Sequence, residues 1–408
     1  MKGYLRTQAK EECFGCEACA QACRYNAIIM EEDDEGFRYP VIDSEKCVKC
    51  GACNKTCPFE DLPEKFQDKH YVFGGYNEDL AVRDRSTSGG IFSAIADEWC
   101  DDNYVIFGAA AKGLEVYHSH ILDKKEIDIF RKSKYSQSQV EDSYLEAKKF
   151  LQEGKKVLFS GTPCQIAALR KILGDYSKSE KLLTVEVVCE GFPSPLLLRK
   201  YKAYLEEKKE IKIEELDYRY KDGNRWDYEV MNITYSSLHN PMRGTIKCDR
   251  WFNPFWIFWA DRLMSRPSCV PCPFRTPDRE ADITLGDLWG SQLYCPELYG
   301  QNKGCSLVVC NSKKGIDTFK KTLPHLYGHE LKYEDALKYQ RPMRVVVPAN
   351  PRRDEFMNDL KTLNYKELCK KWNPHEPLKV LFKKYIFGKN SQVVWLWNLK
   401  KRIKSIFK

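Results

Sequence analysis

The chain has 408 residues, 43% of them hydrophobic, which predicts two or three folded domains rather than a disordered chain. Its first residues lack the apolar core of a secretory signal, and no apolar run could cross a bilayer, so we expect a cytoplasmic protein. Eighteen cysteines in such a protein favour metal binding or redox chemistry over disulfides. Residues 377–408 carry a net charge of +9, which exceeds the +8 of the whole chain and argues against a general basic surface for nucleic acid.

Two cysteine runs with the same spacing stand near the start of the chain. The first run is C-x2-C-x2-C-x3-C, and the second repeats it and is followed by Pro58. Bacterial two-cluster ferredoxins use this spacing, with the fourth cysteine of each run binding the other cluster. The spacing predicts a small ferredoxin fold over residues 1–62 that holds two [4Fe–4S] clusters. Cluster one would take Cys13, Cys16, Cys19 and Cys57, and cluster two would take Cys47, Cys50, Cys53 and Cys23.

Zinc is the alternative occupant of these cysteines. Structural zinc usually takes two well-separated C-x2-C pairs, whereas each run here is compact, so the spacing favours iron. Gly15 and Gly51 suit a backbone that wraps closely around a cluster. Arg24 stands where the first run would carry Pro, which does not affect ligation because the thiolate is the ligand.

The remainder of the chain predicts a mixed α/β body. Residues 60–70 are polar and contain Pro63, which is typical of a linker. Strand-like and helix-like segments then alternate, and no G-x-G-x-x-G marks a standard Rossmann site. We expect strands over 71–76, 104–111, 116–121, 155–161 and 181–191, and helices over 91–100, 141–152, 165–173 and 195–208.

The body contains two further candidate sites. The turn Ser86-Thr87-Ser88-Gly89-Gly90 precedes a predicted helix, whose free amides attract an anion such as a diphosphate, although such turns alone more often indicate a plain helix cap. Four cysteines could hold a third [4Fe–4S] cluster, because two of them follow predicted strands and two form a C-x2-C loop. Ordinary buried cysteines are the alternative. The four are Cys164, Cys189, Cys269 and Cys272.

At these residues the body resembles the beta-subunit family of coenzyme F420 hydrogenases and dehydrogenases, fused to a two-cluster ferredoxin domain. The motifs follow the family's order over residues 70–295, and six ordered motifs are more specific than any one alone. The matching segments are Ser86–Gly90, Ser133-Lys134-Tyr135 with Gln137-Ser138, Gly161-Thr162-Pro163-Cys164-Gln165, Cys189-Glu190-Gly191, the Cys269–Cys272 pair, and ADITLGDLWG from Ala281 to Gly290.

This resemblance implies an FAD-binding body, in two parts over residues 70–155 and 156–350, with a [4Fe–4S] cluster on the four body cysteines. It implies that Ser86–Gly90 binds the flavin diphosphate and that Lys134 and Asp287 are the candidates for catalysis. A polar surface loop and a turn-forming Asp are the respective alternatives. Glu190 departs from the family, which often has His there. The other residues expected near the flavin are Tyr135, Gln137, Ser138, Gly161 and Thr162.

The segment over residues 377–408 predicts a basic amphipathic helix near the C-terminus. Leu396, Leu399, Ile403 and Ile406 fall on one helical face among several lysines. Such a helix can lie on an anionic surface at the inner face of a membrane, or dock on the protein itself or on an acidic partner. The sequence leaves these alternatives open.

These features together predict an iron–sulfur flavoprotein oxidoreductase. It would move electrons between ferredoxin-type clusters and a small organic substrate through FAD, with a ferredoxin-like protein as electron donor or acceptor. A non-catalytic electron-transfer subunit and a redox-sensing or scaffold protein are the alternatives. The family's fold serves several substrates, so it does not choose the substrate here.

Overall fold

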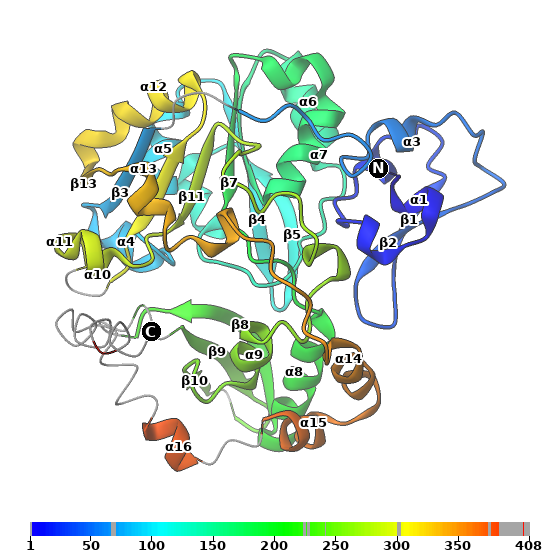
Figure 1. Ribbon diagram of the computed structural model, residues 1–408, viewed down its shortest axis with the longest axis vertical. Helices are drawn as coiled ribbons and strands as arrows, with labels where there is room; N and C mark the ends of the chain where they lie inside the picture. The colour runs from blue at the N-terminus through cyan, green and yellow to red at the C-terminus, as the bar shows by residue number, and fades with distance from the viewer. Residues whose placement is uncertain are drawn as a thin grey trace.

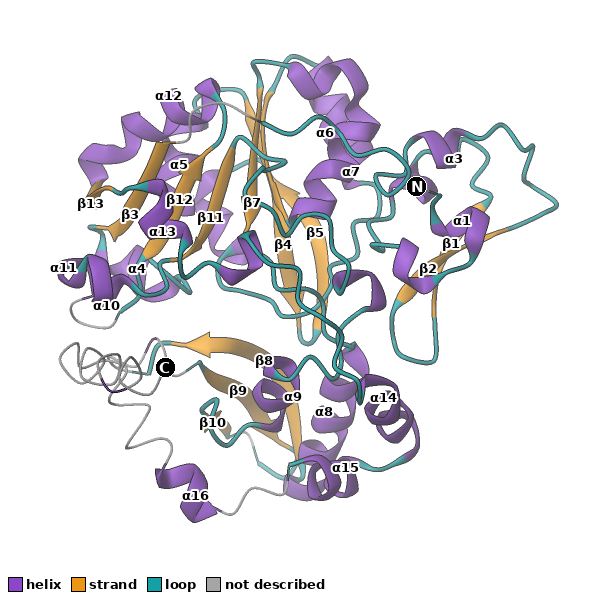
Figure 2. Cartoon of the chain, in the orientation of Figure 1, coloured by secondary structure: helices purple, strands orange, loops and turns teal. Residues whose placement is uncertain are grey.

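The computed structural model describes residues 2–66, 71–222, 226, 229–240, 242–299, 303–373, 377–382 and 403. The N-terminal segment lies beside a large sheet, and a small sheet with its own helices forms a further layer (Figures 1 and 2). Within the described part of the chain, no helix is long and apolar enough to span a bilayer.

The N-terminal segment consists of short elements around the two cysteine runs. A short helix holds the third cysteine of each run, and an antiparallel hairpin of β1 and β2 lies between the runs, with Ile29 opposite Val41. The elements are α1 (Tyr4–Thr7), η1 (Lys10–Glu12), α2 (Ala18–Gln21), β1 (Ile28–Glu32), β2 (Arg38–Ile42) and α3 (Ala52–Lys55).

The large sheet has eight strands in the order β13-β3-β12-β11-β7-β6-β4-β5. The pairs β11–β7, β7–β6 and β6–β4 are parallel and the other pairs are antiparallel, so the mixed α/β body that the sequence predicts is confirmed. The strands are β3 (Tyr71–Asn77), β4 (Tyr104–Lys112), β5 (Glu115–Ile121), β6 (Lys156–Gly161), β7 (Leu182–Val187), β11 (Ile283–Asp287), β12 (Ser306–Cys310) and β13 (Leu326–Glu330).

Helices cover this sheet where amphipathic segments follow its strands. The predicted helices over 91–100, 141–152 and 165–173 correspond to α5, α6 and α7, whose apolar residues are buried. The helices are α4 (Leu80–Arg85), α5 (Ile91–Trp99), η2 (Lys124–Phe130), α6 (Ser143–Gln152), α7 (Pro163–Leu173), η3 (Gly174–Lys178), α10 (Ser291–Tyr294), α11 (Pro296–Tyr299), α12 (Lys313–Thr322), η7 (Leu323–His325), α13 (Tyr333–Leu337) and η8 (Arg341–Met343).

A small antiparallel sheet in the order β10-β9-β8 forms a second part of the body. Its core contains Phe255, Phe258 and Phe356, which come from helices far apart in the sequence. The helix α9, which precedes the Cys269 loop, supplies Phe255 and Phe258 to this core. The elements are α8 (Pro195–Lys209), β8 (Ile211–Tyr220), β9 (Val230–Ser237), β10 (Arg243–Cys248), α9 (Pro254–Ala260), η5 (Pro267–Cys269), α14 (Arg353–Thr362) and α15 (Tyr365–Trp372).

The N-terminal segment and the body share one hydrophobic core. Phe14 and Phe59 of the segment belong to the same buried cluster as Phe159, Ile166 and Phe274 of the body. Helix α2 contacts both α6 and α7, beside which the segment lies in Figure 1. The segment is thus packed onto the body and not merely tethered to it.

The C-terminal tail contributes one described helix, α16 (Pro377–Phe382). The rest of the segment over residues 377–408, in which the sequence predicts a basic amphipathic helix, lies outside the described residues, apart from Ile403. Residues 67–70 of the predicted linker also lie outside them.

Candidate functional site

The first cysteine run lines a cavity inside the N-terminal segment, which we call the N-terminal cysteine cavity. Glu17 takes a left-handed conformation with φ 64°, and α2 begins directly after it, so the chain turns between the ligands of this run. The Gly15 amide donates to Cys13 Sγ at 3.3 Å, a type of contact that tunes cluster ligands. The walls of the cavity include Phe14, Cys13, Cys16, Cys19 and Cys57.

The second run lies nearer to solvent. Cys50 is exposed, whereas Cys16, at the same place in the first run, is buried. Burial raises the pKa of Cys53, and the neighbouring thiols of Cys23 and Cys47 raise it further. Cys23 thus lies with the second run, just as Cys57 lies with the first. This is the crossed arrangement that the sequence predicts for the ligands, and ligation itself stays a prediction.

The thiols do not gather around a single point. Within the described residues, no three His, Cys, Asp or Glu side chains converge as the ligands of one metal ion do. A cubane spreads its four thiolates over four iron corners, so its ligands stand further apart than those of one zinc ion.

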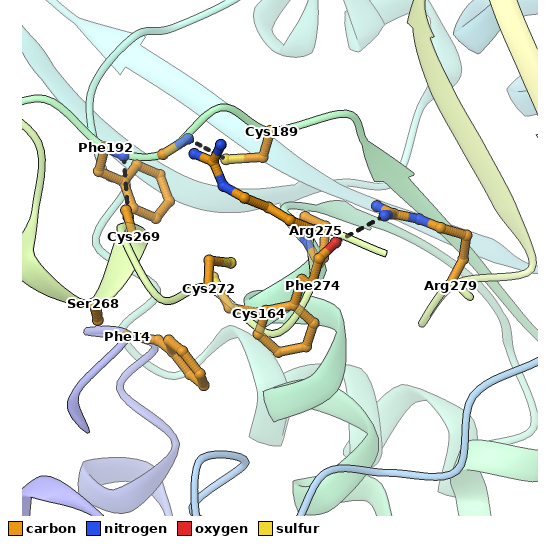
Figure 3. A pocket seen from close by; sticks show the side chains of 12 residues that line it. Phe14, Cys164, Cys189, Phe192, Ser268, Cys269, Cys272, Phe274, Arg275 and Arg279 are labelled. Carbon is orange, nitrogen blue, oxygen red and sulfur yellow. Dashed lines mark hydrogen bonds between the residues drawn. The ribbon is translucent and has the colours of Figure 1, made fainter. Parts of the chain in front are cut away.

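Four cysteines of the body line a second pocket, the body cysteine pocket (Figure 3). Cys164 lies in the first turn of α7, which begins with Pro163 and is capped by Thr162 and Gln165. Cys189 follows the end of β7 by two residues. Because β6 and β7 are parallel neighbours, Cys164 and Cys189 meet at the same edge of the sheet.

The C-x2-C loop approaches from the other side of this pocket. Cys269 ends η5, and Cys272 follows in the next turn. Gly191 has φ 109°, and a Cβ there would lie 2.9 Å from Cys269 Cβ, so this close approach requires glycine. The amides of Gly191 and Phe192 donate to the sulfurs of Cys189 and Cys269, each at 3.3 Å. The backbone therefore already hydrogen-bonds two of the four thiols.

The charge balance of this pocket fits an iron–sulfur cluster. Burial raises the pKa of Cys189 to about 12 and that of Cys269 to about 11, and neighbouring thiols add to both effects. Four thiolates gathered in this pocket therefore require a cation such as cluster iron. Two buried donors that line the pocket, Arg275 Nη1 and Ser268 Oγ, have no partner within the described residues. The sulfurs of a cluster would accept from both donors.

Phe14 joins the two cysteine sites. It lines both the N-terminal cysteine cavity and the body cysteine pocket. Its ring centroid lies 5.2 Å from that of Phe59 and 5.2 Å from that of Phe274. The first run is therefore the one that faces the body cysteines.

A large cavity of about 440 Å³ adjoins the body cysteine pocket. Cys189, Gly191 and Phe192 line both spaces. Trp256, Trp259 and Trp289 supply aromatic walls. Five of the predicted flavin residues line this cavity, namely Lys134, Tyr135, Ser138, Gly161 and Thr162.

The other predicted flavin residues do not line the large cavity. Within the Ser86–Gly90 turn, Ser88 Oγ donates to the Cys305 carbonyl and the Gly89 amide donates to Ser306 Oγ. The turn reaches the cavity wall through Thr87 Oγ1, which accepts from the Ser133 amide at 2.8 Å. Gln137 turns away from the cavity, because its amide donates to the carbonyls of Phe14 and Gly15, each at 2.8 Å.

The two candidates for catalysis, Lys134 and Asp287, differ in the contacts that their side chains make. Lys134 Nζ donates to the Arg131 carbonyl at 2.8 Å, and burial together with the nearby Lys132 charge lowers the pKa of Lys134 to about 7. Asp287 forms an ion pair with the buried Arg219. Lys134 can therefore change its charge near neutral pH, while the side chain of Asp287 is engaged by Arg219.

Sequence reasoning missed several residues that shape these sites. His118 is buried in the cavity wall, and burial lowers its pKa to about 4, so the imidazole is neutral. Its Nε2 lies 3.1 Å from the Ser160 carbonyl, which can only accept, so Nε2 carries the proton and Nδ1 accepts from Ser138 Oγ at 2.9 Å. Arg275, three residues after Cys272, is the missed residue with a local signal, since it flanks the C-x2-C loop.

Comparison with known proteins identifies two regions of the chain. Residues 154–334 match the C terminus of the coenzyme F420 hydrogenase/dehydrogenase beta subunit, and residues 12–60 match a 4Fe-4S dicluster domain. No curated protein matches the sequence. A solved chain from the F420-reducing [NiFe] hydrogenase complex of Methanosarcina barkeri is 16% identical, with a TM-score of 0.40 over 75% of this chain and 91% of that one. The chain therefore combines a region similar to the C terminus of the coenzyme F420 hydrogenase/dehydrogenase beta subunit with a 4Fe-4S dicluster domain, and it is a beta-subunit-like iron–sulfur electron-transfer protein.

Proposed function

We propose that this chain is an iron–sulfur flavoprotein oxidoreductase with a third [4Fe–4S] cluster and an FAD in its body. The observation that carries the proposal is a row of three adjoining spaces. Phe14 is common to the N-terminal cysteine cavity and the body cysteine pocket, and Cys189 is common to that pocket and the large cavity. The order of these spaces gives the order of the electron relay.

The support for the third cluster is chemical. Cys164, Cys189, Cys269 and Cys272 share one pocket, and their raised pKa values mean that the thiols need a cation to deprotonate. Arg275 Nη1 and Ser268 Oγ would donate to its sulfurs. Leaving such buried donors unpaired costs about 1–3 kcal/mol each, so an acceptor in the pocket is favoured.

The support for FAD is the size and lining of the large cavity. Its volume of about 440 Å³ falls within the range of cofactor sites, and aromatic side chains form much of its wall. Lys134, Tyr135 and Ser138 would hold the ring system, and Gly161 and Thr162 would approach it from the end of β6. Bound FAD would join one-electron carriers to two-electron chemistry on a small organic substrate.

The diphosphate role of Ser86–Gly90 has weaker support. The hydroxyls of this turn are engaged by the backbone and by Ser133, and Gly90 precedes α5 with φ 77°. The free amides at the start of α5 still suit an anion, so the turn stays our candidate for the diphosphate end.

The exposed second run is the proposed docking point for a ferredoxin-like donor or acceptor. Cys50 is exposed on the surface, whereas the first run faces the body. An electron that enters at cluster two would meet cluster one before it meets the body. This order fits a chain that exchanges electrons with an external one-electron carrier.

Cofactor counts on anaerobically purified protein test the proposal. We expect about twelve irons and one FAD per chain, and about four irons fewer in the Cys272→Ser variant. Cys369→Ser is the matched control, because Cys369 lies on α15 in the small-sheet core, and its iron count should equal that of the wild type. A wild-type protein with about eight irons and no flavin would favour the alternative of a non-catalytic electron-transfer subunit.

The role of Lys134 has its own test. A protonated Lys134 would stabilise anionic reduced flavin, so Lys134→Met should lower the flavin midpoint potential. Lys125→Met is the control, because Lys125 is exposed and does not line the large cavity. Since the Lys134 pKa is about 7, the difference between wild type and variant should be largest below pH 7 and shrink above it. Equal potentials at pH 6 would remove Lys134 from the flavin site.

Contact of residues 377–408 with an anionic membrane surface is a separate proposal, supported by the basic amphipathic pattern of the sequence. Sedimentation with anionic liposomes would test it. Equal binding by the full chain and by a chain without residues 377–408 would contradict it.

A further inference from the structure

Arg266 is a buried arginine at the contact between the N-terminal segment and the body. Its side chain is fully buried. Its backbone belongs to the body and lies three residues before the body cysteine Cys269. The Arg266 amide donates to the Phe192 carbonyl at 2.8 Å, and the Cys269 amide donates to the Arg266 carbonyl at 3.0 Å. The residue is therefore fixed to the loops of the body cysteine pocket at its backbone.

The guanidinium of Arg266 reaches across to the first cysteine run. Nε donates to the Cys13 carbonyl at 2.9 Å, and Nη2 donates to the Arg38 carbonyl at 3.0 Å. Nη1 donates to Gln137 Oε1 at 3.1 Å. A Cβ at position 15 would lie 2.9 Å from Arg266 Cζ, so only glycine at this position leaves room for the guanidinium.

All of the hydrogen-bond partners of Arg266 are neutral. Each is a carbonyl or amide oxygen, and the guanidinium also lies over the ring of Tyr39 at 4.3 Å. Three carboxylates of the surrounding elements already have cations, whereas Glu12 of η1, which packs against η5, forms no ion pair among the described residues. Glu17 pairs with Arg38, Asp33 with Lys10 and Glu35 with Arg353. Among the described residues, no carboxylate forms an ion pair with Arg266.

A buried charge without a counter-charge is expensive, so an anion is expected nearby. A [4Fe–4S] cluster with four thiolate ligands is an anion, and it gains one more negative charge when it accepts an electron. Cluster one is the group that would lie beside Arg266, because Cys13 is both its predicted ligand and the contact of Nε. A fixed positive charge there favours the reduced cluster.

We propose that Arg266 is a positioning residue for electron transfer, which supplies the buried counter-charge of cluster one and thereby raises the reduction potential of that cluster. This inference rests on the dicluster domain and not on the third cluster or FAD of the proposed function. Cluster two has no such residue among those described, since the lysines of its run, Lys46, Lys49 and Lys55, are exposed and their charges are screened by water.

A redox titration tests the proposal. It uses the anaerobically purified full chain and monitors the reduction of each cluster by electron paramagnetic resonance. Arg266→Gln should lower the midpoint potential of one N-terminal cluster, and Arg266→Lys should retain most of the wild-type potential. Cys50→Ser identifies the signal of cluster two, so the shifted signal should be the one that Cys50→Ser leaves intact. Arg24→Gln is the matched control, because Arg24 is exposed beside Cys23, and it should shift neither cluster.

Two outcomes would overturn the proposal. Wild-type potentials in Arg266→Gln would show that the charge does not act on cluster one, and equal shifts in Arg266→Gln and Arg266→Lys would assign the effect to packing. If Arg266→Gln does not retain its iron, the proposal is tested instead by measuring how the midpoint potentials of the two clusters in the wild-type protein depend on ionic strength. The potential of cluster one should change less with ionic strength than that of cluster two, and an equal change would overturn the proposal. A protein with about eight irons and no flavin would contradict the proposed function but leave this test unaffected.

Discussion

The two cysteine runs share a spacing and a backbone turn, but only the first packs against the body. Glu17 and Gly51, the residues after the second cysteine of each run, both take left-handed conformations, with φ 64° and 74°. Cys16 is nevertheless 8% exposed, while Cys50 is exposed. The ligands and the turn are therefore the same in both runs, and the side chains between the ligands decide which run is buried.

The residue after the first cysteine differs most between the runs. Phe14 is 5% exposed in the shared core, whereas Val48 at the same place is 54% exposed. The next residue is Gly15 in the first run and Lys49 in the second. A side chain on Gly15 would collide with Gln137 Nε2, at 2.6 Å from its Cβ, whereas Lys49 extends into solvent. An aromatic residue followed by glycine thus marks the docked run.

The position after the second cysteine repeats this difference. Glu17 is buried, pairs with Arg38 at 2.8 Å and accepts from the amides of Val140 and Glu141. Gly51 has no neighbour within 4 Å of the place where its Cβ would be. A non-glycine residue in the left-handed region costs about 1–2 kcal/mol, which the three contacts of Glu17 offset. The second run also has a non-glycine residue in this region, Lys49 with φ 56°, so the two turns differ in their contacts and not in backbone strain.

Breaking a ligand in each run should give the largest contrast. Cys16→Ser and Cys50→Ser should each lose about four irons, because one cubane is lost in each variant. Only Cys16→Ser should stop electron delivery from a small reductant to an acceptor, because cluster one faces the body and cluster two does not. Iron counts and anaerobic acceptor reduction measure this. Equal electron delivery by the two variants would contradict the assignment of the first run to the body.

Truncating the side chain after the first cysteine should give the next largest effect. Phe14→Ala should lower the free energy of unfolding by about 3–5 kcal/mol, because it opens a cavity between Phe59 and Phe274. Val48→Ala should stay within about 0.5 kcal/mol of the wild type, as is usual for exposed positions. Denaturant unfolding under anaerobic conditions measures both. A Phe14→Ala protein as stable as Val48→Ala would mean that the segment does not share the body's core.

The two runs should also differ in the rate at which they lose iron. An iron chelator with a mild oxidant should strip cluster two at least about tenfold faster than cluster one, because release of the buried cluster requires local opening of the shared core. Alkylation of freed thiols, followed by mass spectrometry, should label Cys50 before Cys16. Simultaneous labelling of the two cysteines would contradict the difference in burial.

Much of this arrangement is readable from the sequence. The alternation of strands and helices predicts the core of the large sheet, from β3 to β7, and the helix α8 that follows it, because those segments have clear periodicity. The strand-end rule predicts that Cys164 and Cys189 come together, and they do line one pocket. The two runs predict a ferredoxin-like region, which the match to a 4Fe-4S dicluster domain confirms.

The rest depends on contacts between distant parts of the chain. The strand β12 is an apolar run of five residues, too short for periodicity to distinguish a strand from a helix. The hydroxyls of Ser86–Gly90 are engaged by residues 305 and 306, which no local pattern reveals. Arg266 likewise finds its partners in the first run, far away in sequence. The Phe-Gly pair of the first run distinguishes it from the second, but the pair alone does not reveal that Phe274 is the surface it packs against.

The smallest expected effect concerns Gln21 and Lys55, which occupy matching positions near the end of each run. Gln21 Oε1 accepts from the amides of Tyr144 and Leu145 at 3.1 and 3.3 Å, so the N-terminal segment caps α6, whose own N-cap side chain makes no capping hydrogen bond. Loss of such a cap costs about 1 kcal/mol, which is the destabilisation expected for Gln21→Ala. Lys55→Ala should leave the unfolding free energy within about 0.5 kcal/mol, because Lys55 is exposed.

Gln21→Glu distinguishes a cap from simple packing. Gln21 Nε2 is buried and has no partner within the described residues, so its replacement by a carboxylate oxygen removes an unpaired donor. A carboxylate also interacts favourably with the positive end of α6. Gln21→Glu should therefore be at least as stable as the wild type in denaturant unfolding, while Gln21→Ala is not. If both variants lose the same stability, Gln21 acts through its volume, and the first run is held to the body by its core contacts without help from the cap.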